Sequence, residues 1–159
     1  MDYFKHVATN SDRWVQLQEF GRTNEKRPQV LAVISTPENL ARIDDIRQNN
    51  LRLAGVVDGS PNEANPVAIA WLGFSVHGNE AAGSEASMQV VYELANPANA
   101  KTAEWLKNTV VLIEPSVNPD GYSRYTSQYR QASPDEPDPA PRQRAQRALA
   151  GWPGEPLLL

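Results

Sequence analysis

The sequence contains no cysteine and only two histidines, His6 and His77. Without thiols there can be no disulfide bonds and no thiolate metal sites, so histidine, aspartate and glutamate would have to hold any metal ion. No apolar run reaches the ~18 residues of a membrane-spanning helix. The N-terminus also lacks the apolar segment of a secretory signal. The 15 basic and 19 acidic residues argue against general binding to nucleic acid or anionic membranes.

Proline is unevenly distributed along a chain that has the size of one domain. Six of the 13 prolines lie between Pro134 and Pro156, in a stretch that is also rich in charge. We therefore expect a folded part over residues 1–132 and a proline-rich, charged tail over 133–159. The tail should be irregular, apart from a short helix around 141–150.

Continuous apolar runs alternate with segments of helical spacing. The runs predict strands covered on both faces, at residues 29–35, 67–74 and 109–114. Helices are expected over 3–9, 37–53 and 80–95 and around Trp105, with one further strand over 14–20. This alternation indicates an α/β fold with a largely parallel central sheet. The side chains expected to be buried in it are Val30, Val33, Ile69, Trp71, Val111 and Ile113.

His77 and Glu80 follow the second apolar run directly, in the stretch SVHGNEAAGSE. Ligands of open α/β sheets bind at the carboxyl ends of the strands. Two side chains three residues apart at a helix start can face one point, and an imidazole nitrogen and a carboxylate oxygen are both suitable zinc ligands. An isolated His-x-x-Glu pattern is also typical of an ordinary helix start with a surface histidine, so a second element is needed.

The second element is the stretch NPDGY, residues 118–122, just beyond the third apolar run. Proline at its second position and glycine at its fourth are typical of a type I turn. This stretch is expected at the same edge of the sheet as His77. Two such loops on one edge predict a binding crevice.

Four stretches together resemble the zinc carboxypeptidases of the M14 family. HGNE with AAGSEA is similar to that family's His-x-x-Glu zinc motif, and NPDGY is similar to its second landmark. The stretches FGRTNEKRP (20–28) and VISTPEN (33–39) resemble the strand pair and helix entry that precede them. The resemblance covers most of residues 1–131. It implies a largely parallel or mixed sheet flanked by helices, a phosphorylase/hydrolase-like fold that is incomplete in this chain.

By this resemblance the chain is a metallocarboxypeptidase, which cleaves the C-terminal peptide bond of a peptide or protein by means of water activated on Zn²⁺. His77 and Glu80 become the first two zinc ligands. Arg130 is similar to the arginine that polarises the scissile carbonyl, with Arg124 as a competitor for that role. Asn79 stands where some members carry a substrate-contacting arginine. The family resemblance also implies a secreted or periplasmic location. From charge and hydropathy, we expect no nucleic-acid partner and no membrane span.

The family pattern further needs a third zinc ligand, a histidine downstream of NPDG, and then a catalytic glutamate; neither can be identified here. We therefore expect a truncated form that binds zinc weakly and has little activity. Two alternatives stay open. One is a zinc deacylase of the aspartoacylase or desuccinylase type, and the other is a non-catalytic remnant or peptide-binding module without metal.

Overall fold

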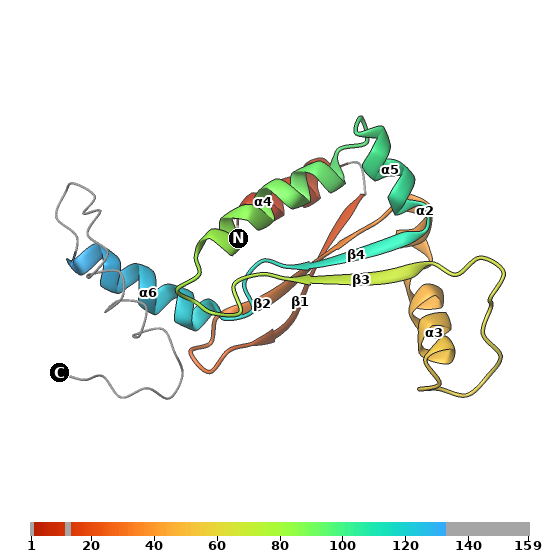
Figure 1. The fold of residues 1–159 in the computed structure, drawn as a ribbon, viewed down its shortest axis with the longest axis horizontal. Helices are drawn as coiled ribbons and strands as arrows, with labels where there is room; N and C mark the ends of the chain where they lie inside the picture. Colours follow the sequence, from red (N-terminus) through yellow and green to blue (C-terminus); the bar gives the residue numbers. More distant parts are fainter. Residues whose placement is uncertain (1, 12–13, 133–159) are drawn as a thin grey trace.

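The computed structural model describes residues 2–11 and 14–132 (Figure 1). The tail predicted over 133–159, with its short helix, lies outside the described residues, so the boundary near residue 132 stays a prediction. None of the helices in residues 2–11 and 14–132 has both the length and the apolar character needed to cross a membrane.

A four-stranded mixed sheet forms the centre of the molecule, in the order β1-β2-β4-β3 (Figure 1). Its strands are β1 (Val15–Arg22), β2 (Pro28–Ile34), β3 (Ala68–Gly73) and β4 (Thr109–Glu114). β2 runs antiparallel to both β1 and β4, and β3 runs parallel to β4. The three apolar runs are thus confirmed as strands of one sheet. The sheet is mixed, with one parallel pair among the described strands.

Six helices are described. They are α1 (Asp2–Asn10), α2 (Pro37–Ala41), α3 (Ile43–Leu53), α4 (Ala82–Ala95), α5 (Ala100–Leu106) and α6 (Pro119–Ala132). Thr36 caps α2, because its hydroxyl accepts a hydrogen bond from the Asn39 N–H (3.3 Å). The helix expected over 37–53 is broken, however, since Arg42 has a non-helical backbone (φ −119°, ψ 29°) that separates α2 from α3.

The central strands β2 and β4 are covered on both faces, because alternate residues of each strand point to opposite sides. On one face, Ala32, Ile34, Val111 and Ile113 pack with α1 and α4. On the other face, Val33 and Val110 pack with Leu40 of α2 and Ile46 of α3. Figure 1 shows α1 and α4 on one side of the sheet and α3 on the other.

The predicted burial of β3 is wrong. Val33, Val111 and Ile113 are buried as expected, and Val30 is half-buried. Ile69 and Trp71, however, are 38% and 62% exposed. The physical reason is position in the sheet: β3 is an edge strand beyond β4. Among the described residues, neither buried cluster includes a residue of β3.

Candidate active site

The two loops singled out by the sequence leave neighbouring strands at the same edge of the sheet. β3 and β4 end side by side, with Gly73 paired to Glu114. Backbone hydrogen bonds continue beyond the strands: the N–H of Val117 donates to Phe74 O (2.8 Å), and the N–H of Asn118 donates to Ser75 O (3.2 Å). The loop that carries His77 and the stretch NPDGY therefore lie together at the carboxyl ends of two parallel strands, where ligands of α/β sheets bind.

These two loops also approach each other closely at Gly78 and Gly121. A Cβ atom placed on Gly78 would lie 2.1 Å from the carbonyl carbon of Gly121 and 2.2 Å from the nitrogen of Tyr122. Real side chains do not tolerate such distances, so the two backbones can meet only because residue 78 has no side chain. Gly78 therefore serves close packing of the two loops.

Ser75 provides the sharp turn that leads from β3 into the HGNE loop. Its φ of 50° lies in the left-handed region, which is costly for a residue other than glycine. The Ser75 hydroxyl donates to Glu80 O (3.1 Å) and accepts from the Ser84 N–H (2.9 Å). These bonds fix the HGNE loop to the first turn of α4. Sequence reasoning missed this role, because a serine with a left-handed backbone has no distinctive pattern.

His77 and Glu80 lie in one tight turn, in which the Glu80 N–H donates to His77 O (3.0 Å). The His77 side chain is half-buried and that of Glu80 is exposed. Within residues 2–11 and 14–132, no three histidine, cysteine, aspartate or glutamate side chains gather closely enough to hold a metal ion. A catalytic zinc takes three protein ligands, so the described residues do not complete such a site.

The stretch NPDGY begins helix α6, which corrects the prediction of a turn. Asn118 is the capping residue: its side-chain Oδ1 accepts from the Gly121 N–H (2.9 Å), and its carbonyl accepts from the Tyr122 N–H (3.1 Å). Pro119 is the first residue of the helix, a position that suits proline. A type I turn and the first turn of a helix have similar dihedral angles, and here the following residues continue the helix.

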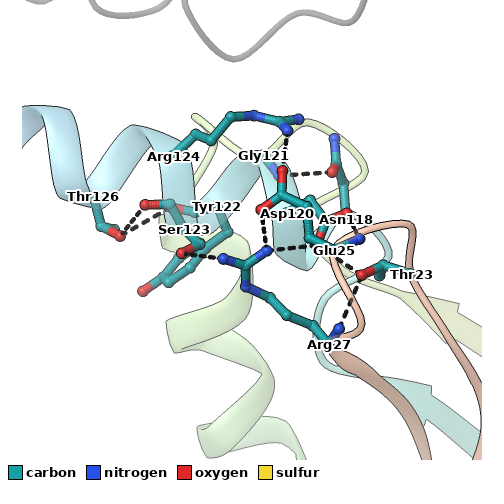
Figure 2. A network of polar contacts seen from close by, with 10 residues as sticks. All are labelled: Thr23, Glu25, Arg27, Asn118, Asp120, Gly121, Tyr122, Ser123, Arg124 and Thr126. Atoms are coloured by element: carbon teal, nitrogen blue, oxygen red, sulfur yellow. Dashed lines mark hydrogen bonds and ion pairs between the residues drawn. The ribbon is translucent and has the colours of Figure 1, made fainter.

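Asp120 connects this helix to the hairpin turn between β1 and β2 (Figure 2). Its Oδ1 accepts from the hydroxyl of Thr23 (2.7 Å) and from Nη1 of Arg27 (2.8 Å), and its Oδ2 accepts from the Glu25 N–H (3.4 Å). Burial acts to raise the pKa of Asp120, but the hydrogen bonds from Thr23 and Arg27 outweigh it and hold this pKa below its usual value. Nη2 of Arg27 also donates to Ser123 (3.0 Å).

The network around Asp120 joins two of the stretches that were quoted from the sequence, FGRTNEKRP and NPDGY. Sequence reasoning missed it, because Arg27 and Asp120 are 93 positions apart. The aspartate of NPDGY is 9% exposed and fully engaged by the hairpin. Its role in this structure is therefore to hold α6 against the β1–β2 turn.

The two candidate arginines both lie on α6. Arg124 forms an ion pair with Glu25 of the hairpin turn (Figure 2). Arg130 is exposed in the last turn, about 14 Å along the helix axis from Gly121 at 1.5 Å per residue. Burial and Glu85 raise the pKa of Tyr122, whereas Arg130 acts to lower it. The role of Arg130 toward a scissile carbonyl stays a prediction.

Glu114, the last residue of β4, is a buried carboxylate that the sequence analysis did not single out. Its residue is 4% exposed, and burial raises the pKa of its side chain. Glu114 ends the apolar strand TVVLIE, so its burial could have been expected from its place in that run.

Comparisons with known proteins agree with this architecture. A family model described as zinc carboxypeptidase, Peptidase M14, matches residues 1–148. The fold is similar to that of a metallo-carboxypeptidase from Burkholderia cenocepacia, with a TM-score of 0.51, 21% identity and 75% of this chain covered. It is also similar to thrombin activatable fibrinolysis inhibitor, with a TM-score of 0.56, 16% identity and 87% covered. The matches span 26% and 30% of those two chains. The comparison with curated proteins returned no relative.

Proposed function

This chain belongs to the zinc carboxypeptidase family, and on that premise we propose that its site serves zinc-dependent hydrolysis of C-terminal peptide bonds, with His77 and Glu80 as two of the zinc ligands. One observation carries the proposal: the backbone contact between Gly78 and Gly121. It sets the His-x-x-Glu turn against the start of α6, at the carboxyl ends of two parallel strands. The substrate would be the C-terminus of a peptide or protein.

The small number of candidate zinc ligands limits the zinc affinity and the turnover expected of this chain alone. Two candidate ligands on one turn leave a zinc ion with fewer protein donors than a catalytic site uses. Metal affinity falls with ligand number, and a hydrolytic site also needs a general base. We therefore expect weak zinc binding and little or no turnover from these 159 residues.

Arg130 is our candidate for the carbonyl-polarising residue, in preference to Arg124. The Arg124 guanidinium is already paired with the Glu25 carboxylate, and using it on a substrate would break that pair. Arg130 is exposed at the far end of α6. The contribution of Arg130 can be tested only when turnover is measurable. The experiments therefore begin with the proposed metal ligands.

The decisive experiment is a metal titration with a matched pair of variants. Zn²⁺ binding to the full chain is followed by calorimetry, and Co²⁺ binding is followed by its visible absorption. The chain offers an internal control, because it has two histidines. His77→Ala should abolish the weak binding, whereas His6→Ala on α1 should leave it unchanged. Equal binding by His77→Ala and the wild type would remove the zinc assignment.

Substrate assays separate the proposed activity from its alternatives. The full chain is incubated with Zn²⁺ and a blocked dipeptide that has a free C-terminus, and in parallel with N-acetylaspartate and an N-succinyl amino acid. No turnover is expected of any of them. Release of the C-terminal amino acid would contradict the incompleteness of the site, and hydrolysis of an N-acyl amino acid would favour the deacylase. Metal-independent binding of the dipeptide would favour a peptide-binding module.

A further inference from the structure

Two Asp-Gly dipeptides occur in the chain, Asp58-Gly59 and Asp120-Gly121. In such a pair the backbone nitrogen of the glycine can attack the side-chain carboxyl carbon of the aspartate, because glycine has no side chain that hinders the approach. The product is a five-membered cyclic imide, which can open to isoaspartate. The two dipeptides share this chemistry, so their surroundings in the fold decide which of them reacts.

Asp120-Gly121 is held at both of the groups that would react. The Gly121 N–H donates to Asn118 Oδ1 (2.9 Å). The Asp120 carboxylate accepts hydrogen bonds from Thr23 and Arg27 (2.7 and 2.8 Å). The aspartate is also 9% exposed, in the first turn of α6. Formation of the imide here would first require these contacts to open locally.

Asp58-Gly59 lies in the loop between α3 and β3, where both residues are exposed. The loop is fixed on either side of them. The N–H of Val56 donates to a carbonyl of α3 (2.9 Å), and the N–H of Asn62 donates to Asn49 Oδ1 (2.6 Å). Between these points, neither the Asp58 carboxylate nor the Gly59 N–H has a hydrogen-bond partner within residues 2–11 and 14–132. Both reacting groups are therefore available without local unfolding.

The fold also requires a glycine at position 59. Its φ of 114° lies in the left-handed region, which residues with a side chain rarely adopt. A Cβ atom placed there would lie 3.1 Å from Nε of Arg52. The loop therefore retains, next to an exposed aspartate, the residue that hinders formation of the imide least.

This dipeptide is remote from the candidate active site. It precedes β3, whereas His77 and Glu80 follow that strand. β3 has six residues, about 20 Å at ~3.3 Å per residue. Figure 1 shows the loop before β3 at the end of the sheet opposite α6. The inference is therefore independent of the proposed hydrolytic function.

We propose that Asp58 is a site of spontaneous modification to isoaspartate in the folded protein. The Gly59 nitrogen bonds to Cγ of the protonated Asp58 carboxyl group, and the carboxyl hydroxyl leaves with the N–H proton as water. Water then adds to the imide and breaks one of its two C–N bonds. Breaking the bond to Cγ restores aspartate. Breaking the bond to the backbone carbonyl carbon gives isoaspartate, in which the main chain runs through Cγ.

Ageing of the full chain tests the proposal, with the second dipeptide as an internal control. The folded protein is kept at neutral pH for several weeks and then digested with a protease that cuts before aspartate but not before isoaspartate. Mass spectrometry should show at least about tenfold more isoaspartate at position 58 than at 120, because the hydrogen bonds around Asp120 must open first. Equal amounts at the two positions, or none at 58, would overturn the proposal.

A methyl-transfer assay gives an independent readout. A purified methyltransferase that recognises isoaspartate moves a labelled methyl group from S-adenosylmethionine to the free carboxylate of the modified residue. The aged chain should be labelled on the peptide that contains position 58, and the fresh chain should not. Aged protein that accepts no methyl group on this peptide would contradict the assignment.

Two variants and the unfolded chain separate the fold from the local sequence. Asp58→Glu should lose the signal at 58, because its longer side chain would have to close a six-membered ring. Asn118→Ala frees the Gly121 N–H and should raise isoaspartate at 120 about fivefold, the worth of a helix cap. In guanidinium chloride both dipeptides should react at similar rates. A tenfold difference that persists there, or no rise at 120 in Asn118→Ala, would refute the role of the fold.

Discussion

β3 and β4 have nearly the same character in the sequence and opposite environments in the structure. Each has six residues, AIAWLG and TVVLIE, and the two strands pair in parallel along their whole length. In β4 four of the six residues are buried, whereas β3 has none buried. β4 lies between β2 and β3, but β3 is the edge of the described sheet. An apolar run therefore identifies a strand, and the strand's neighbours decide whether it is buried.

The largest effect should come from the same substitution made in each strand. Ile113 of β4 is fully buried and Ile69 of β3 is 38% exposed. Ile113→Ala should lower the free energy of unfolding by about 2–5 kcal/mol, because it removes buried methyl groups and leaves a cavity. Ile69→Ala should cost at most about 1 kcal/mol. Urea denaturation measures both, and equal losses would break the comparison between the strands.

The next effect concerns the loops that follow the two strands. Gly78→Ala places a methyl group about 2 Å from the backbone at Gly121, so the loops must separate. We expect a loss of about 1–3 kcal/mol, as for other overpacked sites. Gly21→Ala is the control, since the nearest atom to its new methyl group is 3.7 Å away. If Gly78→Ala were no worse than Gly21→Ala, the contact between the loops would be wrong.

The link between α6 and the hairpin should make stability depend on pH. The pKa of Asp120 is lowered in the folded state, so its contribution is present above its unfolded pKa of about 3.9 and is lost as pH falls through the folded pKa. Asp120→Asn should therefore destabilise the protein most at pH 7 and progressively less in acid. Thr23→Val removes one donor to the carboxylate and should weaken the same trend. Denaturation at pH 7 and pH 3 measures it, and a pH-independent difference would contradict the account.

Glu114 at the end of β4 should give the opposite trend. Burial raises its pKa in the folded state, so stability is lost as pH rises from the unfolded pKa of about 4.3 through the folded pKa. Glu114→Gln should be more stable than the wild type at pH 7, and this gain should vanish in acid. A Glu114→Gln protein that is less stable at pH 7 would show that the carboxylate has a favourable partner.

The smallest effect is expected at a strongly exposed residue of β3. Trp71 is 62% exposed, and threonine keeps a high preference for strands. Trp71→Thr should change the free energy of unfolding by no more than about 0.5 kcal/mol, as is usual for surface positions. The same urea titration measures it. A loss of several times this size would mean that the outer part of β3 is covered in solution.

The sequence predicted the strands well because continuous apolar runs can be satisfied only inside a sheet or a buried helix. It failed at Ile69 and Trp71 because strand order is a property of the whole fold. It failed at Arg42 because the helical spacing continues through the break. Asn118, Pro119 and Asp120 repeat the pattern of Thr36, Pro37 and Glu38, a cap, a proline and an acid. The helix that begins after Thr36 was predicted correctly. Applying the same capping pattern to Asn118, Pro119 and Asp120 would have predicted α6.

The candidate site was only partly accessible to sequence reasoning. The HGNE loop and NPDGY each follow an apolar run, so the sequence predicted both at the ends of neighbouring strands. The structure confirms that placement. The zinc assignment of His77 and Glu80 stays a prediction. Sequence reasoning missed the contact between Gly78 and Gly121. It also missed the hydrogen bonds that Thr23, Glu25 and Arg27 donate to Asp120. Both sets of contacts join segments that are distant in the chain.

We expect the antiparallel pairing of β2 with β4 to form late in folding, because it joins segments that are distant in the chain. Ala32 pairs with Ile113, about 80 positions later, whereas β1 and β2 are joined by a short turn. A hairpin forms in about 1–10 μs, but at about 5–20 residues per second the ribosome needs about 4–16 s to add the residues up to β4. During this time the inner edge of β2 has no partner. We therefore expect the closure of this long loop to be the slow step of folding.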